Sequence, residues 1–139
     1  LIEKGYVQNQ QEAYNRLIGF GCPAYAQRDP LLPQEAIEQI KKAGGLPIIA
    51  HPGLIGDDRM VHKLLEFGAE GLEAYYAYHS PAQIAKYLEI AESYGVITGC
   101  GSDYHGPGRT KSQPLGSVVA PIEVLDRFRE KVQANAIRK

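Results

Sequence analysis

The chain has 139 residues, with 15 Lys and Arg against 16 Asp and Glu, so its formal net charge is −1. This balance argues against nucleic-acid binding through a broad basic face. No apolar run reaches the roughly 18 residues that a membrane helix needs, and no secretory signal is visible. Cys22 and Cys100 form neither a disulfide framework nor a zinc-finger spacing. We therefore expect a cytoplasmic protein, with a length suited to one domain.

The first residues predict the end of one helix and the start of another. The chain does not begin with Met, and residues 1–6 read as the tail of a helix closed by Gly5. This pattern indicates a piece cut from a longer protein. Asn9 followed by Glu12 predicts a capping box that opens a helix to about Ile18. A loop rich in Gly, Pro and aromatic residues is expected to follow, over 19–33.

From residue 34 onward, predicted helices alternate with short apolar strands. We expect helices over 34–43, 59–67, 80–94 and from 121 onward, and strands over 46–50, 71–76 and 96–101. Ser80, Pro81 and Gln83 are concordant start signals for one helix, and Asp57 or Asp58 caps another. In the last helix, one face carries Ile122, Leu125, Phe128 and Val132. Cys100 lies in a Gly-rich strand, where we expect a buried thiol.

This alternation predicts the α/β class, with a parallel sheet. The strands are apolar on both faces, as expected when helices cover them. Three buried parallel strands are few for a free-standing α/β domain. The pattern therefore favours a segment of an open barrel, or a sheet that is completed by missing chain.

Polar side chains follow or occupy each predicted strand, and they predict a metal site. His51 follows the first strand, Glu73 lies in the second, and Asp103 and His105 follow the third. The C-terminal ends of parallel strands meet at one edge of the sheet, where ligands bind. Asp103 and His105 face the same side of an extended backbone, and a carboxylate with an imidazole suits zinc, manganese or iron. We therefore predict His51, Asp103 and His105 as metal ligands.

Each of these assignments has an alternative that the sequence leaves open. A strand-end histidine such as His51 can instead bond a backbone carbonyl, and the Asp103–His105 segment can instead form an Asx turn. Glu73 either orients a ligand or pairs with a helix lysine.

Three further residues are candidates for binding an anionic substrate. His79 precedes the helix capped by Ser80, whose N-terminal amides attract anions. Arg28 and Arg109 lie in loops from which a guanidinium can reach a phosphate. The alternatives are a loop histidine and solvated loop charges. The tyrosines at 75, 76 and 78 either stack on a base or pack within the strand.

Four segments together resemble a known family. They are GGLPIIAHPG at 44–53, GLEAYY at 71–76, HSP at 79–81 and GSDYHG at 101–106. This combination resembles the C-terminal part of a PHP (polymerase and histidinol phosphatase) phosphoesterase, nearest to bacterial nucleotide 3′-phosphatases and 5′-to-3′ exoribonucleases that act on short RNA. The resemblance covers nearly the whole chain. It implies a distorted (β/α)7 barrel in which two or three manganese, zinc or iron ions assist the hydrolysis of phosphate esters.

The resemblance also assigns roles and exposes a departure. It implies that His51, Asp103 and His105 each ligate a different metal, and that His79 lies near the substrate phosphate. The family's H-x-H motif, its bridging glutamate and a histidine in an Arg-Pro-His segment are absent from these residues. We therefore expect residues 1–139 to be the C-terminal part of a PHP domain, a partial barrel that lacks the N-terminal metal-binding half and is inactive alone.

The missing strands would leave an open sheet edge, which predicts a homodimer or domain swapping. Two other functions stay open beside a phosphoesterase acting on a phosphorylated small molecule or short RNA. One is a non-catalytic binding or structural module with a PHP-like fold. The other is an amidohydrolase-like barrel, which also places His and Asp at strand ends.

Overall fold

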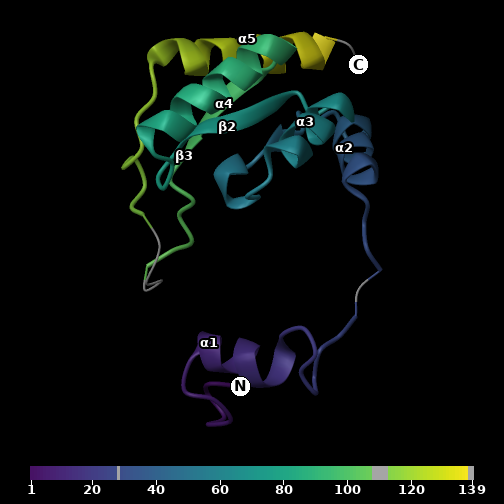
Figure 1. The fold of residues 1–139 in the computed structure, drawn as a ribbon, viewed down its shortest axis with the longest axis vertical. Helices are drawn as coiled ribbons and strands as arrows, with labels where there is room; N and C mark the ends of the chain where they lie inside the picture. Colours follow the sequence, from purple (N-terminus) through teal and green to yellow (C-terminus); the bar gives the residue numbers. More distant parts are fainter. Residues whose placement is uncertain (28, 108–112, 138–139) are drawn as a thin grey trace. The chain divides into compact units, whose positions relative to one another are not determined.

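A computed structural model describes residues 1–27, 29–107 and 113–137 of the chain (Figure 1). The chain divides into two compact units, Leu1–Leu31 and Leu32–Lys139. Among the described residues, no helix combines the length and the apolar character that crossing a membrane requires.

The first unit contains one short helical segment. Helix α1, Gln10–Ala13, continues into a π-helical turn, Tyr14–Ile18. The side chain of Asn9 accepts a hydrogen bond from the backbone N–H of Glu12, at 2.9 Å. The predicted helix and its Asn9 cap are therefore confirmed. The predicted capping box is only half formed, because the Glu12 carboxylate accepts the N–H of Gln8, at 2.7 Å, rather than that of Asn9. The π-helical form of the second half was not predicted.

The turn at residues 1–6 has the geometry that ends a helix. Gly5 has a φ of 74°. The N–H groups of Gly5 and Tyr6 donate to the carbonyls of Ile2 and Leu1, at 2.9 and 3.1 Å. This pair of bonds around a left-handed glycine satisfies carbonyls that a helix end leaves free, as the sequence predicts locally.

The second unit contains a parallel sheet of three strands. Strands β1 (Ile48–Ile49), β2 (Gly71–Tyr76) and β3 (Ile97–Gly101) lie in the order β1-β2-β3, and both pairings are parallel. The α/β class with strands alternating with helices is therefore confirmed. The sheet formed by the described strands is open, so the barrel remains a prediction.

Helices α2 (Pro33–Lys42), α3 (Asp58–Glu66), α4 (Pro81–Tyr94) and α5 (Ile122–Ile137) complete this unit, with a 3-10 turn at Pro52–Leu54. The helix starts follow the predicted caps. Asp57 accepts the N–H of Arg59 at 3.0 Å. Ser80 accepts the N–H of Gln83 at 3.3 Å, and Gln83 accepts the N–H of Ser80 at 2.9 Å. These reciprocal bonds fix the first turn of α4, directly after the end of β2.

The core lies between the sheet and helices α2, α3 and α4. Leu72 and Ala74 of β2 are fully buried and cluster with Val61 of α3 and Tyr87 of α4. Ile37 of α2 joins the same cluster. Ile90 of α4 is also buried in this cluster. Burying apolar area of this kind is the main source of stability in a domain of this size.

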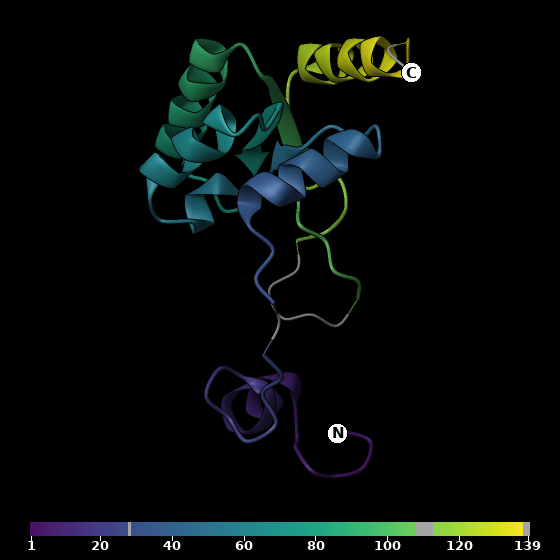
Figure 2. The ribbon, with the colours of Figure 1, turned by 90° about the vertical axis from the view of Figure 1, so that its right-hand side faces the viewer.

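Helix α5 leaves most of its apolar face exposed. The helix itself forms and contacts β3, and Figure 2 shows it set apart from α4. On the predicted apolar face, Phe128 is half-buried, whereas Ile122, Leu125 and Val132 are 61%, 42% and 43% exposed. Cys100 of β3 is likewise exposed, so the expectation of a buried thiol is wrong. Cys100, Ile122 and Leu125 line a cavity between the sheet and α5, which leaves these side chains accessible.

Candidate functional site

Two of the predicted ligands stand in strained backbone at the C-terminal edge of the sheet. His51 follows β1 with a φ of 31°, and Asp103 follows β3 with a φ of 55°. They are the only non-glycine residues with a positive φ in the described part of the chain. Such conformations cost of order 1–3 kcal/mol and cluster at functional sites. The two positions therefore share an edge of the sheet and an unusual backbone.

Tyr76 connects these two residues across the central strand. It is the last residue of β2, and its ring centroid lies 5.5 Å from that of His51. Its hydroxyl donates to Oδ2 of Asp103, at 3.4 Å. Burial raises the pKa of Tyr76 above its ordinary value, and the carboxylate of Asp103 raises it further. Sequence reasoning missed this role, and the only available signal was the position of Tyr76 at the end of the central strand.

Asp103 and His105 lie together, as predicted, although the backbone at Asp103 is left-handed rather than extended. Nδ1 of His105 is 2.6 Å from the carbonyl oxygen of Asp103 and 3.6 Å from its Oδ1. Both residues are exposed. An Nδ1–H that donates to this carbonyl makes Nε2 the acceptor nitrogen of the neutral ring. The pair thus offers a carboxylate and an imidazole, both accessible from solvent.

The described residues fit a metal only as part of a ligand set. Imidazole and carboxylate donors suit zinc, manganese or iron. However, no three His, Cys, Asp or Glu side chains among residues 1–27, 29–107 and 113–137 are grouped so that they hold a metal ion. A metal ion bound by His51, Asp103 or His105 would therefore need further ligands.

His79 is held by the backbone on both sides of its ring. Nδ1 lies 2.9 Å from the carbonyl oxygen of Ala74, and Nε2 accepts the N–H of Gly53 at 3.1 Å. The ring is buried and packs against Tyr76 and Tyr87, at centroid distances of 5.1 and 5.0 Å. These partners select the neutral tautomer with the proton on Nδ1. A phosphate contact through this ring would require breaking one of the two bonds.

The remaining sequence candidates divide into two groups. Glu73 accepts the backbone N–H of His51 at 2.8 Å, so within the described part of the chain its observed partner is this amide rather than a helix lysine. Arg28 and Arg109, with the neighbouring Lys111, lie outside the described residues.

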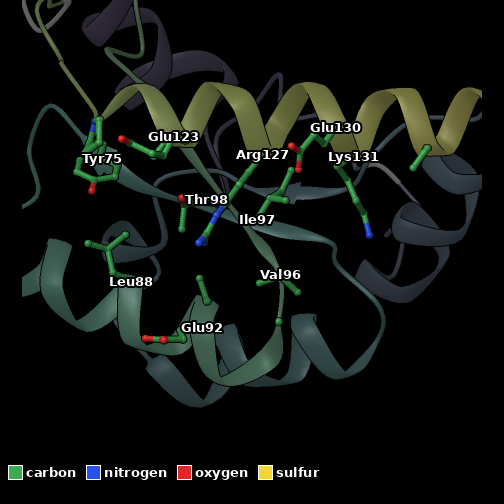
Figure 3. Close-up of a pocket in the computed structure, with 15 residues that line it drawn as sticks. Tyr75, Leu88, Glu92, Val96, Ile97, Thr98, Glu123, Arg127, Glu130 and Lys131 are labelled. Atoms are coloured by element: carbon green, nitrogen blue, oxygen red, sulfur yellow. The ribbon is translucent and has the colours of Figure 1, made fainter.

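Two cavities lie beside α5. One, of about 780 Å³, separates α4 from α5, and Arg127 extends into it from α5 (Figure 3). Its lining does not include His51, Asp103 or His105. A second cavity, of about 560 Å³, lies between the sheet and α5 and is mainly apolar. Glu73 lines this second cavity together with Ala50, which follows β1, and Cys100, near the end of β3, so the cavity lies beside the C-terminal ends of these two strands.

Comparison with protein-family models gives no match, whereas individual curated proteins are similar. A 3′,5′-nucleoside bisphosphate phosphatase from Chromobacterium violaceum is 29% identical over 78% of this chain and 40% of its own length. A 5′-3′ exoribonuclease from Haemophilus influenzae is 31% identical over 77% of this chain and 41% of its own length. A phosphoribosyl 1,2-cyclic phosphate 1,2-diphosphodiesterase from Eggerthella lenta is 34% identical over 52% and 28%.

Solved structures give the same picture. An amidohydrolase from Chromobacterium violaceum with bound sulfate has a TM-score of 0.61 at 27% identity, over 97% of this chain and 48% of that one. A protein from Bifidobacterium adolescentis named as a metal-dependent phosphoesterase shares the fold, with a TM-score of 0.67 at 24% identity over 91% and 46%. The chain thus spans less than half the length of each of these proteins. On this similarity and its motifs, the chain belongs to the PHP phosphoesterase family.

Proposed function

We propose that this chain supplies part of the active site of a metal-dependent phosphoesterase that hydrolyses nucleotide phosphates or short RNA. His51, Asp103 and His105 would act as metal ligands, and residues outside this set would complete each shell. Arg28, Arg109 and His79 stay predictions as substrate-binding residues. The metal would be manganese, zinc or iron, and the protein would form a homodimer.

One observation carries the proposal. The described non-glycine residues with left-handed backbone are His51 and Asp103, two predicted ligands that follow the strands on either side of β2. Strain persists only where surrounding contacts enforce it. Here Glu73 and Tyr76, both from β2, contact the two residues. The names of the similar proteins, which act on nucleoside bisphosphates, cyclic phosphates and RNA, support the reaction class.

The chemistry follows from the exposed edge of the sheet. A bound divalent metal would supply Lewis-acid stabilisation of the phosphoryl oxygens and would lower the pKa of water. The carboxylate of Asp103, held by the Tyr76 hydroxyl, and the imidazole of His51, held through its backbone, would keep their donor atoms fixed. Preorganised donors of this kind need no rearrangement when substrate binds.

The test is a chimera in which this chain replaces the matching part of the Chromobacterium violaceum phosphatase. We expect metal-dependent release of phosphate from a 3′,5′-nucleoside bisphosphate, reduced at least about 100-fold by His51→Ala, Asp103→Asn or His105→Ala. The control is His62→Ala, because His62 lies on α3 and contacts Tyr94 rather than the site. Equal losses in all four variants would contradict the assignment.

The second candidate function is a non-catalytic module, because the described residues do not form a complete set of metal ligands. The absence of a three-ligand group among the described residues is also what a non-catalytic module with this fold would have. Calorimetry with Mn²⁺ and Zn²⁺ measures the metal affinity of the 139-residue chain, which bears on the choice between a phosphoesterase and a non-catalytic module. A chimera that folds and binds metal without hydrolysing phosphate esters would favour the module.

A further inference from the structure

Glu73 is the only charged residue of β2, the central strand. Its neighbours Leu72 and Ala74 are fully buried, and Glu73 itself is half-buried. A carboxylate in such a position is unfavourable unless it is hydrogen-bonded. Its bonding partners therefore indicate why a glutamate stands there.

The carboxylate reaches the end of the strand on each side of β2. Toward β1, Oε2 accepts the backbone N–H of His51 at 2.8 Å, across 22 positions of sequence. This N–H belongs to the left-handed residue with φ 31° and ψ 60°. Toward β3, a methyl group added at Gly101 would overlap Oε1 of Glu73. Gly101 is thus the residue that leaves room for the carboxylate.

The pairing of β2 with β3 is irregular at this point. Glu73 lies opposite Gly99, whereas Tyr75 lies opposite Cys100 and Tyr76 opposite Gly101, so the register shifts between Glu73 and Tyr75. A bulge of this kind re-aims the side chains around it. One strand consequently holds both flanking residues, because Glu73 contacts the backbone of His51 and Tyr76 contacts the side chain of Asp103.

We propose that Glu73 is a positioning residue. It fixes His51 in its left-handed conformation and, by its fit against Gly101, sets the spacing between the ends of β1 and β3. It acts through the backbone of His51 rather than as a metal ligand itself. The statement that His51 is a ligand rests on the proposed function, whereas the positioning of His51 does not.

The experiment is a double-mutant cycle with Glu73→Ala, Gly101→Ala and the double variant. The first readout is amide hydrogen exchange at His51, with the three-bond coupling that reports its φ. We expect roughly tenfold faster exchange in Glu73→Ala, because the N–H loses its acceptor. Gly101→Ala should give a similar change by displacing the carboxylate. The double variant should resemble Glu73→Ala, since the overlap at Gly101 then disappears.

Two further variants separate positioning from general stability. Glu73→Gln keeps an oxygen that can accept the N–H, so it should restore slow exchange at His51. Glu70→Ala removes a nearby carboxylate that bonds Lys131 and Lys41 instead, and it should leave the φ of His51 unchanged. Fully additive effects of Glu73→Ala and Gly101→Ala, or unchanged exchange in Glu73→Ala, would overturn the proposal. Should Glu73→Ala fail to fold, Glu73→Gln and Gly101→Ala still decide it.

The second readout is the affinity of each variant for Mn²⁺ and Zn²⁺ alone. Suppose that His51→Ala loses metal affinity while His51 keeps its normal φ and exchange rate in Glu73→Ala. This outcome would refute the positioning role of Glu73 and support His51 as a metal ligand. A displaced His51 in Glu73→Ala with unchanged metal affinity would support the positioning role and count against His51 as a ligand.

Discussion

His79 is a buried polar residue whose two ring nitrogens are both bonded to backbone. Through Gly53 and Ala74 it ties the turn after β1 to the end of β2. A methyl group at Gly53 would lie 2.7 Å from Nε2 of His79 and 2.9 Å from Nε2 of Gln83. Gly53→Ala should therefore lower the free energy of unfolding by about 1–3 kcal/mol, because it breaks the bond to His79 and crowds the ring.

Urea unfolding measures this change, and Gly99→Ala is the matched control. A methyl group at Gly99 would be 3.6 Å from its nearest neighbour, which is ordinary contact. We expect the control to lose less than about 1 kcal/mol. Equal losses at the two glycines would show that the Gly53–His79 bond contributes little.

At the scale of single residues, some contacts could be predicted from the sequence and others could not. The proximity of Asp103 and His105 was predicted from their spacing of two residues along an extended segment. The two residues do lie together, but the backbone is left-handed at Asp103, with a φ of 55°, so the extended segment assumed for the prediction does not form there. The bond between His79 and Gly53 and the contact of Tyr76 with Asp103 were not predicted, since they join residues 26 and 27 positions apart. Such contacts depend on how neighbouring strands are placed, which no local pattern encodes.

At the scale of elements, Glu70 ties two helices to the start of β2. Its carboxylate lies 2.8 Å from Nζ of Lys131 in α5 and 3.7 Å from Nζ of Lys41 in α2. Burial acts to raise the pKa of Glu70, but Lys131 and Lys41 outweigh it and lower the pKa below its ordinary value. Glu70→Gln should cost up to about 1 kcal/mol near neutral pH, since partly exposed ion pairs are screened by solvent.

The sign of the pH dependence follows from the lowered pKa of Glu70. Its contribution to stability is present above the unfolded-state value of 4.5 and is lost as the pH falls through the lower pKa of the folded state. Wild type and Glu70→Gln should therefore converge below about pH 4.5 in thermal unfolding. The control is Glu38→Gln, which removes the exposed pair with Lys42. A constant difference between wild type and Glu70→Gln down to pH 3 would contradict this account.

Elements were predicted best where local signals agree. β2 has the predicted bounds, and α4 begins at its cap and ends before the left-handed Gly95. β1 is shorter than predicted, because Pro47 has no N–H to donate to the ladder and the chain turns left-handed at His51. The exposed face of α5 could not be predicted, since apolar periodicity identifies a face without showing what covers it.

At the scale of the whole molecule, the core belongs to one of the two units. Every residue of the main hydrophobic cluster lies between Ile37 and Val96. The first unit, Leu1–Leu31, contributes only Val7 and Ala13 as buried apolar side chains among its described residues. A chain that begins at Leu32 should therefore keep cooperative thermal unfolding, with a midpoint within a few degrees of that of the full chain. Loss of the transition would show that the first unit is required.

The exposed face of α5 and the outer edge of β3 are the surface on which a dimer would form. Ile122, Leu125 and Val132 are exposed on α5, and the outer edge of β3 has no partner among the described strands. An apolar helix face beside an open strand edge favours association between copies. Sedimentation velocity at rising concentration should show a dimer, and Leu125→Lys should weaken it at least about tenfold by placing a charge in the buried contact.

Leu54→Lys is the control, because Leu54 is 63% exposed and belongs to the turn after β1 rather than to α5 or β3. This variant should dimerise like wild type. A monomer at all concentrations would refute the dimer, and equal weakening by both lysines would place the contact elsewhere. Circular dichroism of both variants separates loss of association from loss of folding.

Because a closed sheet has no free edge, the chimera with the Chromobacterium violaceum phosphatase should be monomeric if the added strands cover β3.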